Sequence, residues 1–126
     1  MDAEPRNRFS GTPLSVWIKQ IPNELPVDAV GIWQIVGPAR HDFGLEGEAL
    51  VSCLRRAVHA LLARGARPVI GGGDTGFYWL PQPQYGSEPD EIADAVLREW
   101  QARGMPDEDP GGLWFALPED CEARWK

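Results

Sequence analysis

The sequence has little of what builds a disulfide framework or a metal centre. Its 126 residues hold two cysteines, Cys53 and Cys121, and two histidines, His41 and His59. Two cysteines are too few for a disulfide framework. The chain also lacks the Cys-x-x-Cys and His-x-x-x-His spacings that are typical of structural zinc sites. We therefore expect neither a metal site nor a cofactor.

Long apolar runs are also missing. No stretch approaches the roughly 20 apolar residues of a membrane-spanning helix, and residues 1–13 lack the apolar segment of a signal peptide. These absences predict a cytoplasmic protein that does not associate with membranes. Residues 1–13 carry charge and the prolines Pro5 and Pro13, so we expect a flexible leader, followed by a single domain over residues 14–126.

Basic residues are fewer than acidic ones. The chain has 12 lysines and arginines against 19 aspartates and glutamates, a formal charge of −7 and a pI near 4.7. The one clear basic cluster, Arg55, Arg56 and Arg64, is too small to reverse that sign. An acidic chain repels phosphate backbones, so nucleic acid is not an expected partner. A basic protein partner is compatible with this charge.

Two segments of the sequence have strong helical periodicity. Residues 46–64 carry an apolar stripe at helical spacing, and Gly65 is suited to end that helix. Residues 87–104 form the second predicted helix, with Ser87 as its cap and Pro89 in its first turn. The apolar positions are Leu50, Cys53, Leu54, Ala57, Val58, Leu61 and Leu62 in the first segment and Ile92, Ala95, Val96 and Trp100 in the second.

Five further segments have the patterns of strands. Residues 14–21 alternate, and residues 29–36 are apolar at nearly every position, which is typical of a central strand. The other three are residues 66–71, 77–80 and 113–118.

The predicted class is α+β, a two-layer α/β sandwich of order β-β-α-β-β-α-β. Residues 29–117 have the order of a ferredoxin-like core, with 14–21 as an extra N-terminal strand at an outer edge. An N-terminal hairpin in a differently ordered sheet is the alternative.

The segment Gly71–Gly76, with the sequence GGGDTG, suggests three different structures. A phosphate-binding loop needs a following helix and a lysine, but a strand-like segment follows here. The triplet Asp74-Thr75-Gly76 resembles that of aspartic proteases, a family that pairs two such carboxylates and lacks long helices. A hairpin turn explains the glycines best. The segment nevertheless has more glycines than one short turn needs. Gly72, Gly73, Asp74 and Thr75 therefore stay candidates for a binding site.

The predicted loop 37–44 contains a histidine beside an aspartate, His41 and Asp42. Such a pair can act as a general base with its orienting group, but no nucleophile is identifiable nearby, and a solvated loop is the favoured interpretation. One alternative function follows: a small-molecule-binding protein or enzyme whose pocket lies between this loop and the glycine turn. Its participants would be Asp74, Thr75, His41, Asp42 and Tyr78.

Six tryptophans are many for this length. If both helices cover one sheet face, Trp17 and Trp33, together with Tyr78 or Trp79, contribute to an open aromatic face of the kind that marks interfaces. Alternatively, the terminal segments fold over that face and form a second small core. The favoured function is a non-enzymatic protein-binding or self-associating module, with a protein partner or a homodimer. In size and acidity the chain resembles bacterial immunity-type proteins, an analogy of class only.

Overall fold

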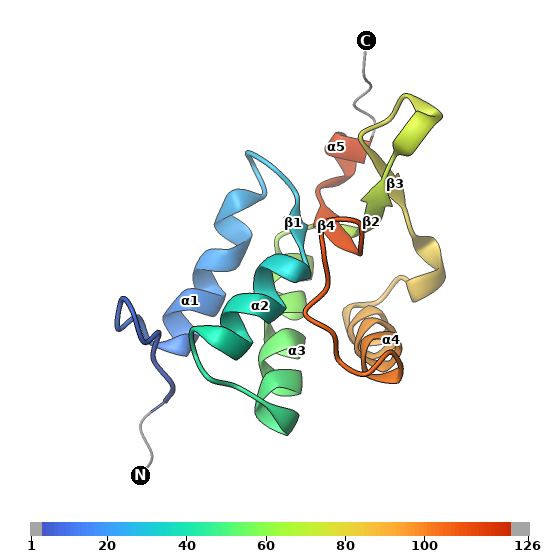
Figure 1. Ribbon diagram of the computed structural model, residues 1–126. Coiled ribbons are helices and arrows are strands. Elements are labelled where there is room, and N and C mark those ends of the chain that lie inside the picture. The colour runs from blue at the N-terminus through green and yellow to red at the C-terminus, as the bar shows by residue number, and fades with distance from the viewer. Residues whose placement is uncertain (1–3, 122–126) are drawn as a thin grey trace.

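The computed structural model describes residues 4–121 and confirms the α+β class. Within that range, five helices accompany a four-stranded antiparallel sheet that packs against α3 and α4 (Figure 1). The helices are α1 (Leu14–Gln20), α2 (Trp33–His41), α3 (Gly47–Ala63), α4 (Pro89–Ala102) and α5 (Pro118–Cys121). The strands are β1 (Val30–Gly31), β2 (Arg67–Gly71), β3 (Trp79–Pro81) and β4 (Trp114–Ala116), and short 3-10 turns lie at Ile21–Glu24, Gly73–Thr75 and Pro83–Tyr85.

The two long helices lie where their periodicity predicts them. All seven apolar residues of the predicted α3 stripe are buried. In α4 the prediction of a Ser87 cap is wrong by one residue, because Glu88 is the N-cap. The side chain of Glu91 reaches back and accepts the Ser87 backbone N–H at 2.8 Å. A carboxylate in this position also complements the positive end of the helix dipole.

The strand order contradicts the ferredoxin-like expectation. The sheet runs β1-β4-β2-β3, and β1 has β4 as its neighbour, with Val30 paired to Phe115. A ferredoxin-like core would place the first strand between two others. Here β1 is only two residues long because the chain turns at once into α2, and β4 and β2 occupy the centre of the sheet.

The predicted N-terminal strand over residues 14–21 is wrong, as are both placements considered for it, because Leu14–Gln20 form α1 and Ile21 begins a 3-10 turn. Leu14 and Ile18 are buried, whereas Val16 is 41% exposed. Leu14, Ile18 and Ile21 also fit the helical spacing of three and four, so two periods share the same residues. The helical face is the one that the fold buries.

The predicted central strand over 29–36 and the predicted loop over 37–44 are also largely wrong. Only Val30 and Gly31 pair in the sheet, and a helix then runs to His41 through Pro38. A short apolar run does not distinguish a buried strand from a buried helix by periodicity alone. The run continues at helical spacing through residues that are all buried, namely Ile32, Ile35, Val36 and Ala39.

Burial divides the interior into two unequal clusters. The large one lies between the helices and one face of the sheet, and it includes Phe115 from β4 and Trp100 from α4. The small one lies on the other face and consists of Ala29, Val69 and Ala116. Side chains alternate between faces along a strand, so β4 contributes successive residues to opposite clusters.

Candidate functional site

The hairpin turn predicted at the glycine-rich segment is confirmed, because β2 and β3 pair as an antiparallel hairpin around it. Gly72 donates its N–H to the Tyr78 carbonyl at 2.8 Å, and a Cβ at this position would lie 1.6 Å from the Phe77 oxygen. Gly73 and Gly76 have φ values of +55° and +89°, which L side chains rarely adopt. The turn itself therefore requires three of these glycines.

Some polar groups of this turn form hydrogen bonds within the turn itself. The Thr75 hydroxyl donates to the Gly72 carbonyl at 2.7 Å and accepts the Phe77 N–H at 3.2 Å. Asp74 is exposed at the tip. Gly71, the surplus glycine, pairs with Trp79 in register and has open space where a Cβ would be.

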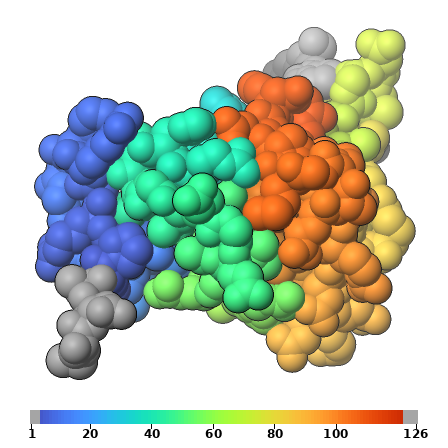
Figure 2. Space-filling model, turned by 60° about the horizontal axis from the view of Figure 1, so that its bottom comes forward, coloured from blue at the N-terminus to red at the C-terminus, as the bar shows by residue number. Residues whose placement is uncertain are grey.

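His41 and Asp42 lie at the end of α2, where His41 meets a different carboxylate from the one beside it in sequence. The His41 Nε2 lies 2.9 Å from the Asp107 Oδ2, and Arg40 binds the same carboxylate. The hydrogen bond from His41, followed by the charge of Arg40, lowers the pKa of Asp107. Figure 2 shows the result, with the segment before β4, in orange, against α2, in teal. These contacts attach a loop to a helix.

The glycine turn and the end of α2 lie at opposite sides of the molecule (Figure 1). The hairpin turn, residues 73–75, lies far from α2 and α3 (Figure 1), and Tyr78 beyond it is 45% exposed. A single pocket lined by Asp74 and His41 is therefore not formed in the part of the chain that the structure describes.

Three tryptophans gather on the sheet face that α3 and α4 leave uncovered. Trp114 lies between the other two, with its ring centroid 6.3 Å from that of Trp33 and 5.0 Å from that of Trp79. All three are half-buried, and Trp79 and Trp114 pack on the small cluster that contains Val69. We call Trp33, Trp79 and Trp114 the tryptophan face. The sequence prediction included Trp33 and Trp79 but missed Trp114, although its alternation with Phe115 indicated a residue on this face.

The indole N–H groups of Trp114 and Trp33 differ in their hydrogen bonding. The Nε1 of Trp114 donates to the Pro110 carbonyl at 2.8 Å. The Nε1 of Trp33 is buried and has no hydrogen-bond partner among residues 4–121. The Trp33 ring lies so close to Gly31 that a Cβ there would be 2.6 Å from the indole Cδ1. A buried donor without a hydrogen bond costs about 1–3 kcal/mol. The Trp33 N–H is therefore expected to lower the free energy of unfolding.

Acidic residues border the tryptophan face. Asp28 precedes the buried Ala29, and Glu119 and Asp120 lie on α5, whose Cys121 packs on the small cluster. Burial raises the pKa of Asp120, and the charges of Glu119 and Asp28 raise it further. We call Asp28, Glu119 and Asp120 the acidic rim. Their mutual repulsion favours a cation at this edge.

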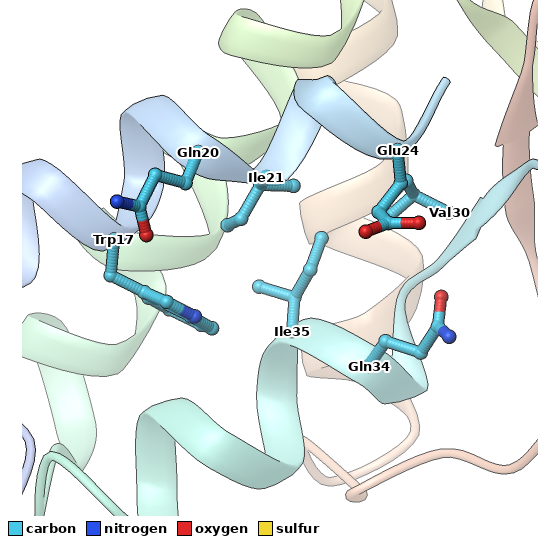
Figure 3. Close-up of a pocket in the computed structure, with 7 residues that line it drawn as sticks. All are labelled: Trp17, Gln20, Ile21, Glu24, Val30, Gln34 and Ile35. Carbon is cyan, nitrogen blue, oxygen red and sulfur yellow. The ribbon is translucent and has the colours of Figure 1, made fainter. Parts of the chain in front are cut away.

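Trp17, which the sequence places with the other tryptophans, lies apart from them on α1. Its ring packs against Phe43 at 5.0 Å between centroids. It also lines an open cleft of about 340 Å³ between the α1 segment and α2 (Figure 3). The sequence prediction did not include this cleft, because its two walls were assigned as strands. The lining residues are Trp17, Gln20, Ile21, Glu24, Val30, Gln34 and Ile35.

The other titratable groups with shifted pKa values support structural roles. Burial raises the pKa of the Cys53 thiol to about 11, so the reactive thiolate is scarce at neutral pH. Burial and the hydrogen bond to Glu99 raise the pKa of Tyr85 to about 12. Among residues 4–121, no three His, Cys, Asp or Glu side chains are grouped so that they could hold a metal ion, and no helix is long and apolar enough to cross a membrane.

Comparison with known proteins gave no relative. No family model matches the chain, and no match was found among the curated proteins or the solved structures. The case for a function therefore rests on the chemistry of its surfaces.

Proposed function

We propose that this protein is a non-enzymatic binding module that docks a basic protein segment on its tryptophan face. The observation that carries the proposal is the meeting of three half-buried indoles from separate parts of the chain, on the one sheet face that the long helices do not cover. Rigid aromatic side chains supply large contact areas at low entropic cost, and tryptophan is enriched among the residues that dominate interfaces.

The surroundings of the indoles favour a partner of opposite charge. The acidic rim lies beside the tryptophan face, and the whole chain carries a charge of −7. Arginine side chains of a partner could pair with the rim carboxylates and stack on the indoles. Such a cation would offset the charges of Glu119 and Asp28, which add to burial in raising the pKa of Asp120.

The same charges weigh against self-association through this face. A two-fold dimer would bring the same patch of both copies together. The carboxylates of Asp28, Glu119 and Asp120 would then face further carboxylates across the interface. A homodimer built on this face is therefore the second candidate, and the experiment below separates the two.

The test is a titration of the full chain with a short arginine- and leucine-rich peptide, with the same peptide carrying glutamate for arginine as its control. We expect the basic peptide alone to bind. Trp79→Ala should weaken binding about tenfold or more, a loss typical of central interface aromatics. Phe9→Ala, which removes an exposed aromatic outside the tryptophan face, should leave the affinity unchanged.

Sedimentation of the free protein completes the test. We expect a monomer at micromolar concentration. A dimer that Trp79→Ala dissociates would replace the proposed partner with a second copy of the chain. Equal binding of the acidic and basic peptides, or equal affinity in the Trp79→Ala and Phe9→Ala variants, would contradict the proposal.

A further inference from the structure

We infer that the cleft between α1 and α2 is a second, independent binding site, for a small organic cation with an apolar body and a primary ammonium group. This inference goes beyond the proposed function, because none of the residues that line the cleft belongs to the tryptophan face or to the acidic rim. Val30 in the cleft belongs to the large core cluster, whereas Ala29 beside it belongs to the small one on the other face of the sheet.

The cleft has the size and composition of a small-molecule site. Its volume of about 340 Å³ lies at the lower end of the range of known ligand pockets, roughly 300–1,000 Å³. One wall is the α1 segment with its following turn, which projects side chains at spacings of three, four and seven, and the other is the start of α2. Ile21 and Ile35 line its middle from opposite walls, and the Trp17 ring lies at one end (Figure 3).

The polar groups lie mainly at the other end. Figure 3 shows the Glu24 carboxylate and the Gln34 amide projecting there, beyond the two isoleucines. The Gln34 Oε1 accepts the Gly31 N–H at 2.9 Å, which fixes the amide against β1. The Glu24 side chain, in contrast, has no hydrogen bond or ion pair with any described residue. The carboxylate of the exposed Glu24 is therefore an acceptor available at the end of an apolar cleft.

This arrangement selects the charge of the ligand. A carboxylate accepts hydrogen bonds and donates none when ionised, so it pairs with an ammonium group and repels an organic anion. The aliphatic middle and the indole take an apolar body of the length of a phenylethyl group, and charge-assisted hydrogen bonds orient the ammonium end. A cleft closed by two lysines would have the opposite preference.

The experiment uses phenethylammonium as the probe, with 3-phenylpropionate as the matched anion and 2-phenylethanol as the neutral analogue. Binding is followed through the indole N–H signal of Trp17 in a heteronuclear NMR spectrum of the full chain. We expect the ammonium compound to bind most tightly and the anion to cause no saturable shift of that signal.

Two variants separate a site from a general charge effect. Glu24→Gln keeps the shape of the side chain and removes its charge, so the affinity for phenethylammonium should fall about tenfold. Glu119→Gln removes the same charge from the acidic rim and should leave this affinity unchanged, while it weakens binding of the basic peptide to the tryptophan face. Failure of one proposal is thus distinguishable from failure of the other.

Three results would overturn the inference. They are the absence of a saturable Trp17 shift with millimolar phenethylammonium, equal affinity of the wild-type and Glu24→Gln proteins, and binding of the anion as tight as that of the cation. Glu24 is exposed, so its substitution does not threaten folding. A circular dichroism melt that matches the wild type confirms this for the variant.

Discussion

The two faces of the sheet differ in how completely they cover the side chains of β4. Phe115 is fully buried against the helices, whereas its neighbour Trp114 is half-buried on the tryptophan face. Both are large aromatic residues in β4, and they differ in what covers them. Two long helices cover the first face, and the short α5 borders the second.

Aromatic side chains of one strand therefore do not all belong to the core. The helical face buries aliphatic side chains around Phe115 and Trp100, and this burial holds the fold together. The tryptophan face buries three small or β-branched residues beneath indoles that keep part of their surface in water. Changes on the first face should therefore affect folding, and changes on the second should affect binding.

The largest expected effect is that of Phe115→Ala, which would leave a cavity under α3 and α4. Large-to-small changes of buried phenylalanine cost about 3–5 kcal/mol. Trp114→Ala, one residue earlier, should cost less than half of this, because its side chain is only half-buried. Urea denaturation of both variants measures the difference. Equal losses would mean that the two faces contribute equally to the core.

The next effect sharpens the role of the hairpin that carries Trp79. Gly72→Ala would place a Cβ against the Phe77 carbonyl, and it should cost about 1–3 kcal/mol and displace Trp79. Gly71→Ala, where a Cβ meets open space, should change stability by less than about 1 kcal/mol in either direction. Thermal melts and peptide affinity of both variants provide the measurement. A destabilised Gly71→Ala protein would show that the surplus glycine has a structural role.

A smaller difference in stability is expected between substitutions of two indoles of the tryptophan face. Trp114→Phe removes the hydrogen bond to the Pro110 carbonyl and should cost about 1 kcal/mol more than Trp33→Phe, which removes an N–H without a partner in the described part of the chain. Both substitutions remove the same atoms, so lost volume largely cancels in the comparison. If Trp33→Phe proved the more damaging of the two, the Trp33 N–H would have a partner after all.

The smallest effect is a pair of opposite pH dependences. The pKa of Asp107 is lowered in the folded protein, so its contribution to stability is present at neutral pH and is lost as the pH falls through that pKa. The pKa of Asp120 is raised, so folding is favoured by its protonated form, and that contribution is lost as the pH rises through the folded pKa.

Substitution by asparagine separates these two dependences. Asp107→Asn should destabilise the protein at pH 7, and Asp120→Asn should stabilise it, each by less than about 1 kcal/mol because both groups are near solvent. Both differences should shrink as the pH approaches 3 in denaturation series. Changes of the same sign in the two variants would contradict the assigned environments.

The sequence was informative where one period dominates over a long segment. Both long helices and the glycine hairpin could be predicted, because the stripe from Leu50 to Leu62 and the positive-φ glycines each have one structural solution. Residues 14–41 could not, because Leu14, Val16 and Ile18 satisfy two periods at once and the run around Ile35 satisfies both kinds of buried element.

The candidate sites also differ in how far a local sequence pattern indicated them. Trp33 and Trp79 were expected on one aromatic face together with Trp17, but Trp33 begins α2 and Trp17 lies apart on α1. Trp114 was within reach of the alternation with Phe115. The cleft could not be foreseen, since Glu24 and Gln34 come together only when both flanking segments are helical. The pairing of His41 with Asp107 joins residues 66 apart in sequence, and no local pattern indicates it.

Docking of a basic segment on the tryptophan face can be mapped through the six tryptophan indole N–H signals while the arginine- and leucine-rich peptide is added. We expect saturable shifts at Trp33, Trp79 and Trp114, and unchanged signals from Trp17 and from Trp100, which is buried and donates to the Pro106 carbonyl. Shifts confined to Trp17, or no saturable shift on the tryptophan face, would contradict such docking.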